Sequence, residues 1–446
     1  MTLESEILER IRPTPAEQSA LEARVARITQ ILRERIRERG LSAEPLLVGS
    51  VAKGTHLTAN EVDLFVLFPE ETPRETLEKE GLALGTFLDR REKMFAEHPY
   101  THGYFEGLEV EIVPCYKIVD SSKKMSAVDR TPFHARYVSD RLTGAGRDQV
   151  RLLKAFCKGT GTYGAEARVQ GFSGYLCELL GLKYGSFQAV LEAAREWRAG
   201  TRLELDRAAT RSFPEPLIFV DPVDGGRNVA SAVSAGTLAL FTEAARAYLA
   251  SPKQAFFFPR PRRPLGATAA AALLRRRGTS LLGIALPRPE LTEDVLYPQV
   301  HKARRAIEEM FVREGFSFLA SRAEALPTAV LFLFEFEVSF LPAVERHLGP
   351  PVGVKNAEDF LAKWRGNRAA ASEPFLEGDR WAVLVRRAYR DPAALARAEL
   401  RKLSLGKNLD AAAAKRLEVV PGAKALRKAW LPEVTELLEP RFPWTL

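Results

Sequence analysis

The sequence has few cysteines and no long apolar run. Cys115, Cys157 and Cys177 are scattered and lack the C-x₂-C spacing of a zinc site, which also argues against a disulfide-rich secreted domain. No segment reaches the roughly 18 consecutive apolar residues of a membrane-spanning helix. Residues 1–6 are acidic where a signal peptide is basic. We therefore expect a reduced, cytoplasmic protein with no membrane partner.

Two common nucleotide-binding signatures are absent or misplaced. No G-x-x-x-x-G-K-[ST] phosphate loop occurs, which disfavours P-loop ATPase chemistry. Residues 159–164 match G-x-G-x-x-G, but they follow a predicted helix, Val150–Lys158, whereas a dinucleotide-binding fold requires a strand before that motif. The sequence therefore argues against a Rossmann fold that binds NAD.

The sequence is rich in positive charge and in apolar residues. It has 65 Lys and Arg against 57 Asp and Glu, a formal net charge of +8, and a pI near 9.3, which favours a polyanionic partner such as nucleic acid. Hydrophobic residues make up 46% of the 446 positions. A chain of this size is expected to form about two to four domains with their own cores.

Three carboxylates stand in two predicted strands. Glu61 and Asp63 begin the first strand, and because alternate side chains of a strand share a face, they project together. Mg²⁺ commonly binds one or two carboxylates plus substrate phosphates. Glu111, in the second strand, would complete a set that suits two-metal phosphoryl transfer.

A Gly-Ser turn precedes these strands. Gly49 permits close backbone approach, and the Ser50 hydroxyl with nearby N–H groups is suited to hold terminal phosphates. An acidic pair at the start of a strand is often only a solvated sheet edge. The turn before it and the acidic strand after it are both expected for a metal site, and neither is expected for such an edge.

The order of predicted elements divides the chain into three domains. These are a small α/β catalytic domain (1–145), a mostly helical central domain (146–258) and a C-terminal region (259–446), with a Pro- and Arg-rich boundary at Phe256–Gly266. The C-terminal region has the order β-α-β-β-α-β of an RNA-recognition-like layer, without its aromatic consensus. The predicted helices are Glu17–Glu38, Val150–Lys158, Tyr175–Trp197, Tyr297–Glu314 and Ala357–Trp364, and the predicted strands are Leu46–Ser50, Val62–Phe68, Glu109–Tyr116, Leu217–Val220, Ser280–Leu286, Phe316–Ala320, Ala329–Val338 and Trp381–Val385.

Taken together, the motifs resemble a known family. Val48–Thr55 (VGSVAKGT) and Glu61–Pro69 (EVDLFVLFP) are similar to the polymerase-β-type nucleotidyltransferase signature of archaeal, class I CCA-adding enzymes. Further blocks that resemble the family are Ala96–Tyr100, Val113–Tyr116, Ser126–His134, Gly171–Leu180, Asp221–Asp224 and, more weakly, Leu405–Asn408. The resemblance implies an α+β multidomain fold, with a polymerase-β-like nucleotidyltransferase domain that contains a mixed sheet, a helical central domain and a C-terminal α/β RNA-binding region.

The resemblance also implies residue roles. Glu61, Asp63 and Glu111 would be the catalytic, metal-binding carboxylates, and alignment to Pro114 selects Glu111 over Glu109 on the same strand face. The nucleotide-binding residues would be Ser50, Lys53, His134, Lys154, Tyr163 and Arg227. Of these, Arg227 would read the base edges of CTP and ATP together with the RNA backbone. Without the resemblance, ordinary surface or packing roles would be favoured for Lys154, Tyr163 and His134.

Two positions depart from the family pattern. Glu111 stands where the family usually has Asp, and Lys53 where it commonly has Arg. Glutamate is longer by one C–C bond, about 1.5 Å, and a misplacement of about 1 Å can cost on the order of 100-fold in rate. Lysine keeps the charge of arginine but not its bidentate fork.

The resemblance implies a template-independent, Mg²⁺-dependent enzyme that adds C, C and A to the 3′ end of tRNA. Its partners would be tRNA, CTP and ATP, and the oligomeric state is left open, with a homodimer as one alternative. A poly(A) polymerase or an oligoadenylate-synthetase-like enzyme would share the carboxylates. A catalytically weakened tRNA-binding protein is a further alternative, which Glu111 keeps open. An enzyme that tags small molecules is disfavoured by the long basic C-terminal half.

Overall fold

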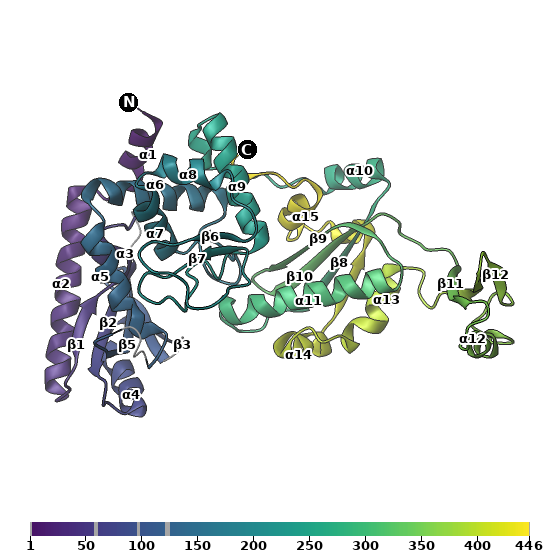
Figure 1. The fold of residues 1–446 in the computed structure, drawn as a ribbon, viewed down its shortest axis with the longest axis horizontal. Helices are drawn as coiled ribbons and strands as arrows, with labels where there is room; N and C mark the ends of the chain where they lie inside the picture. Colours follow the sequence, from purple (N-terminus) through teal and green to yellow (C-terminus); the bar gives the residue numbers. More distant parts are fainter. Residues whose placement is uncertain (1, 58–60, 96–98, 121–124, 446) are drawn as a thin grey trace. The chain divides into compact units, whose positions relative to one another are not determined.

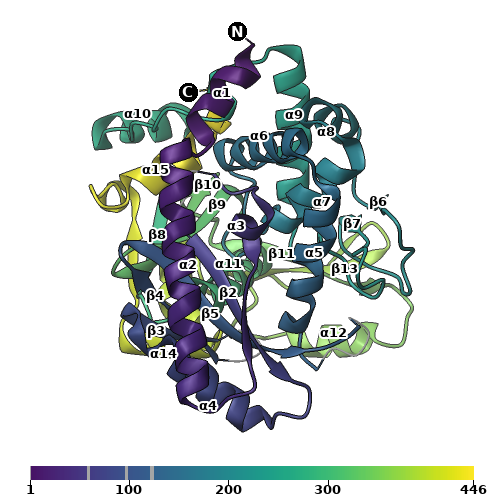
Figure 2. The same ribbon diagram turned by 90° about the vertical axis from the view of Figure 1, so that its left-hand side faces the viewer.

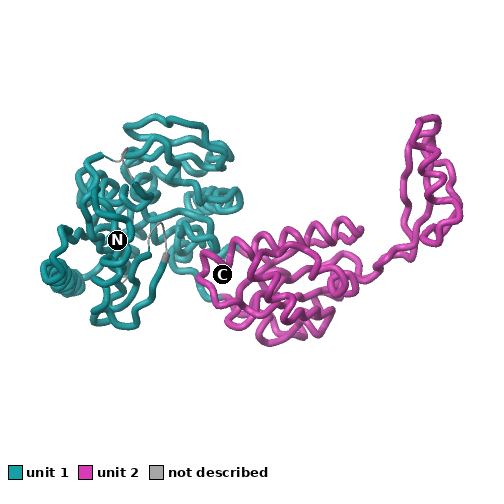
Figure 3. Tube along the Cα trace, turned by 90° about the horizontal axis from the view of Figure 1, so that it is seen from below, with its two compact units in different colours: residues 1–261, 442–446 teal, residues 262–441 magenta. Residues whose placement is uncertain are grey.

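The computed structural model describes residues 2–57, 61–95, 99–120 and 125–445. The chain divides into two compact units, residues 1–261 with 442–446 and residues 262–441 (Figure 3). The end of the chain returns to the first unit, where Trp444 stacks on Phe256 with 5.2 Å between ring centroids. None of the described helices combines the length and the apolar content needed to span a membrane.

The first unit begins with two helices and a five-stranded mixed sheet. Helix α2 (Pro15–Glu38) starts at a capping box formed by Thr14 and Glu17, and its apolar stripe packs against the sheet (Figure 2). The strand order is β1-β2-β5-β4-β3, with β2 and β5 parallel and the other pairs antiparallel. The remaining elements are α1 (Leu3–Ile11), β1 (Glu44–Leu47), β2 (Glu61–Pro69), α4 (Arg74–Leu84), β3 (Asp89–Phe95), β4 (Pro99–Phe105) and β5 (Leu108–Lys117). The predicted α2, β2 and β5 are confirmed.

The bounds of the predicted strand Leu46–Ser50 were wrong, because the observed strand begins at Glu44 and does not reach Ser50. Strand β1 ends at Leu47, and Gly49–Lys53 forms the short helix α3. Gly49 has a φ of +67°, and a Cβ at this position would lie 1.7 Å from Asp63 Oδ2. Only glycine fits both the left-handed backbone and this approach to the carboxylate.

The helical part of the first unit follows the sheet. It contains α5 (Thr131–Arg141), α6 (Gly144–Thr160), α7 (Gly174–Tyr184), α8 (Phe187–Ala194) and α9 (Ala235–Ala250), with a parallel pair of short strands, β6 (Thr201–Leu203) and β7 (Leu217–Phe219) (Figure 1). The single helix predicted over Tyr175–Trp197 was wrong. Gly185, with a φ of +79°, ends α7, and the Ser186 side chain caps α8.

The second unit contains a four-stranded antiparallel sheet of order β14-β8-β10-β9. It is formed by β8 (Ser280–Pro287), β9 (Phe318–Ala325), β10 (Ala329–Phe336) and β14 (Glu418–Pro421), with α10 (Ala267–Arg277), α11 (Glu293–Arg313), α13 (Pro392–Glu399), α14 (Lys407–Lys415) and α15 (Leu431–Leu438). Strand β8, helix α11 and strands β9 and β10 confirm the first part of the predicted β-α-β-β-α-β order.

The predicted helix Ala357–Trp364 and the predicted strand Trp381–Val385 both form, but the prediction that they complete this layer was wrong. Strand β13 (Arg380–Arg386) forms a separate three-stranded sheet with β11 (Val344–Pro351) and β12 (Phe375–Glu377), and helix α12 (Ala357–Trp364) lies beside this sheet (Figure 1). There Val383 and Val385 pack on Phe360 of α12. The strand that completes the first layer is β14, whose four residues, EVVP, are too short for a periodicity signal.

Gly159 allows α6 to pack closely against the backbone near Phe256. A Cβ at Gly159 would lie 2.2 Å from the Phe256 carbonyl oxygen and 2.7 Å from Phe257 Cα. Gly159→Ala should therefore lower the free energy of unfolding by about 1–3 kcal/mol, measured by denaturant titration, because overpacking forces backbone shifts. Gly144→Ala, in the same helix with nothing within 4 Å of the new Cβ, is the control. Equal losses in both variants would contradict this account of the packing.

Candidate active site

The three predicted carboxylates lie on adjacent parallel strands. In the β2–β5 register Glu61 is opposite Glu109, and Asp63 is opposite Glu111. Asp63 and Glu111 line a cavity of about 270 Å³ together with Val48, Gly49, Phe65, Tyr100, Val113, Val128 and Thr131. The Tyr100 hydroxyl donates to Glu111 Oε1 at 3.4 Å. The site is thus built where the Gly49 backbone meets the start of β2.

Burial and mutual repulsion raise the pKa values of two of these carboxyls. Burial, followed by the charge of Glu61, raises the pKa of Asp63 to about 6. Burial, followed by the charges of Asp63 and Glu61, raises the pKa of Glu111 to about 7. A divalent cation would remove this repulsion, and oxygen-only donors suit Mg²⁺. Among the described residues, no three His, Cys, Asp or Glu side chains are already grouped as metal ligands, so that role stays a prediction.

Lys53 and Lys154 share one buried carboxylate. Glu178 Oε2 lies 2.5 Å from Lys53 Nζ, and Glu178 Oε1 lies 2.9 Å from Lys154 Nζ. The Thr55 hydroxyl donates to Glu178 Oε1 at 2.5 Å and accepts from Lys154 Nζ at 2.9 Å. Burial alone would raise the pKa of Glu178, but the two ammonium groups outweigh it and lower the pKa to about 2. The cluster contains two cations and one anion, and it therefore keeps a net positive charge.

Tyr163 and Ser50 lie beside this cluster. A Cβ at Gly174 would be 3.1 Å from the Tyr163 hydroxyl and 3.6 Å from Lys154 Nζ, which places both groups around the start of α7. Burial raises the pKa of Tyr163, so its hydroxyl remains a donor at neutral pH. Ser50 is half-buried in α3, and its carbonyl accepts from the Thr55 N–H at 2.9 Å.

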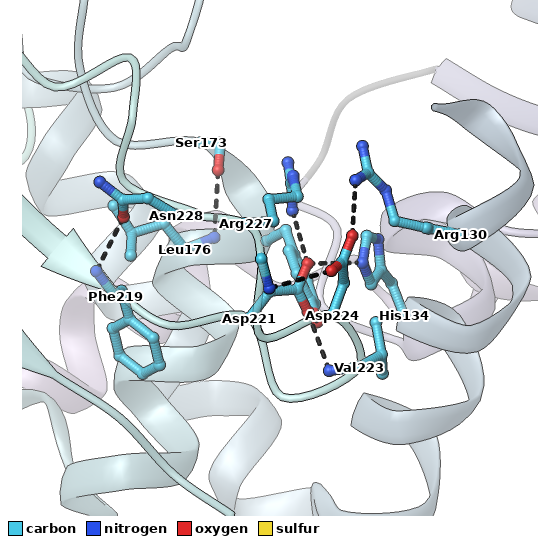
Figure 4. A network of polar contacts seen from close by, with 12 residues as sticks. Arg130, His134, Ser173, Leu176, Phe219, Asp221, Val223, Asp224, Arg227 and Asn228 are labelled. Atoms are coloured by element: carbon cyan, nitrogen blue, oxygen red, sulfur yellow. Dashed lines mark hydrogen bonds and ion pairs between the residues drawn. The ribbon is translucent and has the colours of Figure 1, made fainter. Parts of the chain in front are cut away.

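His134 and Arg227 meet at a second buried carboxylate, Asp221 (Figure 4). Asp221 Oδ2 accepts from His134 Nε2 at 3.0 Å and from Arg227 at 2.8 Å. Its Oδ1 accepts from the Tyr175 hydroxyl at 3.3 Å and from the Val223 N–H at 3.0 Å. Burial alone would raise the pKa of Asp221, but the hydrogen bonds and charges of its partners lower it to about 2.

Tyr175 connects the two clusters. Its ring stacks on His134 with 4.2 Å between centroids, and Lys53 Nζ lies 5.7 Å from the centroid of the same ring. The first unit therefore brings Lys53, Lys154, Tyr163, His134 and Arg227 into one connected arrangement. Residues 96–98 of the family-like block Ala96–Tyr100 lie outside the described residues.

Comparisons with known proteins identify the family. A nucleotidyltransferase domain model matches residues 29–134, a model of the second domain of tRNA nucleotidyltransferases matches 148–258, and a model of the C-terminal domain of CCA-adding enzymes matches 277–422. The CCA-adding enzyme of Halobacterium salinarum is 39% identical over 440 residues, which cover 97% of each chain. The chain belongs to the CCA-adding enzyme family.

Other members of the family are similarly related. The CCA-adding enzyme of Thermoplasma volcanium is 38% identical and covers 91% of this chain and 90% of its own. That of Archaeoglobus fulgidus is 37% identical and covers 91% of this chain and 92% of its own. The predicted family and the α+β multidomain fold are confirmed, with a nucleotidyltransferase domain, a helical middle and a C-terminal domain.

Two central residues of this CCA-adding enzyme received no role from the sequence. Glu178 and Asp221 lie within the family-like blocks Gly171–Leu180 and Asp221–Asp224. One signal was available for Glu178, because a glutamate inside the apolar run YLCELL has to be paired if that run is buried. For Asp221, two of the four partners, His134 and Tyr175, come from distant segments that spacing does not reveal.

Removal of the shared anion should destabilise this CCA-adding enzyme. Glu178→Gln keeps the shape of the side chain but leaves Lys53 and Lys154 buried without a counter-ion. We expect the free energy of unfolding to fall by about 3–5 kcal/mol, the usual result of breaking a buried ion pair from one side. Thermal and urea unfolding would measure it.

The control for this prediction is Glu192→Gln on α8. Glu192 is exposed and accepts a hydrogen bond from Gln188 one turn earlier. Its loss should change the free energy of unfolding by no more than about 0.5 kcal/mol. If Glu178→Gln were as mild as this control, the buried cluster would not be the structural support described here.

Proposed function

We propose that this chain extends the 3′ end of tRNA by C, C and A in that order, with CTP and ATP as substrates and pyrophosphate as the leaving product. The observation that carries the proposal is the register of Asp63 and Glu111 beside the Gly49 turn, in a chain matched along most of its length by CCA-adding enzymes. Family membership favours this activity over poly(A) or oligoadenylate synthesis.

The carboxylates supply the metal-binding part of the site. Glu61, Asp63 and Glu111 would hold Mg²⁺, and the raised pKa values of Asp63 and Glu111 fit a cation-binding site. When bound, Mg²⁺ would polarise the phosphates and favour ionisation of the attacking 3′-hydroxyl. Asp63 is set against the Gly49 backbone, which limits where its carboxylate lies. The Tyr100 hydrogen bond restrains the longer Glu111 side chain.

The Lys53–Glu178–Lys154 cluster is suited to the triphosphate. Its net positive charge would attract the phosphates and stabilise the charge that develops on the departing pyrophosphate. The three N–H donors of Lys154 are used by Thr55 and Glu178, so Lys154 would act on the triphosphate through its charge. Ser50 and Tyr163 would add hydroxyl donors at the edge of the same site.

Arg227 would bind the base of the nucleotide, and His134 would contact its triphosphate. The Arg227 side chain is 32% exposed, and its fork of donors suits acceptors on cytosine and adenine. UTP and GTP present other donor patterns at the corresponding edges and would leave groups unpaired, which is the basis of strong rejection. His134 donates to Asp221 and stacks on Tyr175, which would hold its ring in place for a contact with the triphosphate.

The second unit would bind the body of the tRNA. The positive net charge of the chain suits a phosphate backbone, and recognition of a folded RNA by charge and shape requires no reading of base sequence. We place this activity in the cytoplasm. A homodimer is compatible with the proposal and would be tested by the sedimentation of the full chain.

The test of the function uses three tRNA transcripts, ending before CCA, after C and after CC, each with Mg²⁺ and one labelled NTP at a time. The expected result is C on the first two transcripts and A on the third. Asp63→Ala should reduce each transfer on the order of 1000-fold or more, because a metal ligand supplies several kcal/mol of transition-state stabilisation.

Asp140→Ala is the matched control for the carboxylate. Asp140 is a surface residue of α5 that pairs only weakly with Arg136 at 3.7 Å, with 60% of its side chain exposed. This variant should retain full transfer. Addition of A alone would indicate a poly(A)-type enzyme, and binding of tRNA without transfer by the unmodified chain would indicate the weakened, tRNA-binding alternative.

A further inference from the structure

The segment from Asp221 to Arg227 is a tight loop that closes on its own first residue. The Asp221 N–H donates to the Arg227 carbonyl at 3.0 Å, and the Arg227 N–H donates to the Asp224 carbonyl at 2.9 Å. The Val223 N–H donates to Asp221 Oδ1 at 3.0 Å, which is an Asx-turn. Backbone and side chain of Asp221 therefore both fix the position from which Arg227 projects.

The Asp221 carboxylate has no remaining capacity for a ligand. It is 0% exposed, and its two oxygens accept four hydrogen bonds, from His134, Tyr175, Val223 and Arg227. A carboxylate offers about four lone-pair sites, and all of them are used. Asp221 therefore acts on a substrate only through the groups that it holds.

Arg227 is the outward-facing member of this network. Its side chain is 32% exposed, and in the described part of the chain Asp221 is the one acceptor recorded for its guanidinium. The bond uses NH1 at 2.8 Å. Because a guanidinium is planar and rigid, an anchor at NH1 restricts the directions in which NH2 and Nε can donate.

We propose that Asp221 is a positioning residue for base selection, which aims the free donors of Arg227 and ties them to His134 and Tyr175. This inference rests on the proposed function. The preference for C and A over U and G then depends on a residue that does not touch the nucleotide. Without the hydrogen bond to Asp221, the guanidinium of Arg227 would adopt several orientations. Its N–H groups would then also form hydrogen bonds with the wrong base, which the fixed orientation excludes.

The test compares correct with incorrect incorporation. The transcript that ends before CCA is supplied with CTP or UTP, and the transcript that ends after CC is supplied with ATP or GTP. Asp221→Asn removes the negative charge beside Arg227 and replaces one of the two acceptor oxygens by an N–H₂ donor, although all four partners need an acceptor. We expect the ratio of kcat/KM for the correct over the incorrect NTP to fall on the order of 10-fold or more, the usual effect of losing one charge-assisted hydrogen bond. The KM for the correct NTP should rise more than kcat falls.

Asp224→Asn is the matched control in the same loop. The Asp224 carboxylate accepts from Arg130 at 2.9 Å and from the Gly226 N–H at 3.1 Å. These two contacts hold the loop and do not involve the guanidinium of Arg227, so their loss should leave the correct-to-incorrect ratio unchanged. A comparable fall in the ratio for both variants would overturn the proposal, because it would indicate general loosening of the loop.

A double variant separates positioning from stability. If Asp221 acts through Arg227, the correct-to-incorrect ratio for Asp221→Asn combined with Arg227→Ala should equal the ratio for Arg227→Ala alone. If the two residues act independently, the double variant should have a lower ratio than either single variant. An unchanged ratio in folded Asp221→Asn would overturn the proposal. Absence of transfer by the unmodified chain would instead contradict the proposed function.

If Asp221→Asn does not fold, Tyr175→Phe replaces it. This change removes one donor from Asp221 Oδ1 and keeps the ring that stacks on His134. A fall in the ratio, smaller than 10-fold but in the same direction, would support the proposal, and an unchanged ratio would overturn it.

Discussion

A single buried anion between two cations sets the geometry of the first unit. Lys53 comes from α3, Lys154 from α6 and Glu178 from α7, and all three side chains are at most 8% exposed. None of these charges is tolerated in the interior alone, so the three elements must meet. Because α3 also begins at Gly49, the same constraint places the turn beside Asp63, one of the three carboxylates proposed to bind metal.

Asp221 applies the same principle at the other side of the site. Its two oxygens accept four hydrogen bonds and those of Glu178 accept three, so each anion holds its partners in fixed positions. Tyr175 lies between the two clusters and contacts both. In the proposed site, the two buried acids orient their neighbours, the half-buried Arg227 would donate to the nucleotide, and the two buried lysines would act through their charge. The substitutions at Glu178 and Asp221 therefore test how firmly these side chains are held before a substrate binds, rather than how many charges the site contains.

The elements with strong periodicity were predictable, and those defined by distant partners were not. Helix α2 and strands β2, β5 and β8 follow from apolar patterns that extend over a whole element. The break between α7 and α8 depends on the single Gly185, and β14 becomes a strand because β8 offers it an edge. Glu61, Asp63 and Glu111 were predicted from local motifs, whereas Glu178 and Asp221 contact partners 24 to 125 positions away, and Asp221 also contacts Arg227 across a loop.

The central claim is that one nucleotide site lies in the first unit, between the carboxylates of β2 and β5 and the two clusters around Glu178 and Asp221. The most direct measurement is a crystal structure of the full chain with Mg²⁺ and a CTP analogue whose α–β bridge resists transfer. The account predicts the triphosphate between the Gly49 turn and the lysines Lys53 and Lys154, with the base at Arg227. An analogue bound elsewhere, with Asp63 and Glu111 away from its phosphates, would contradict it.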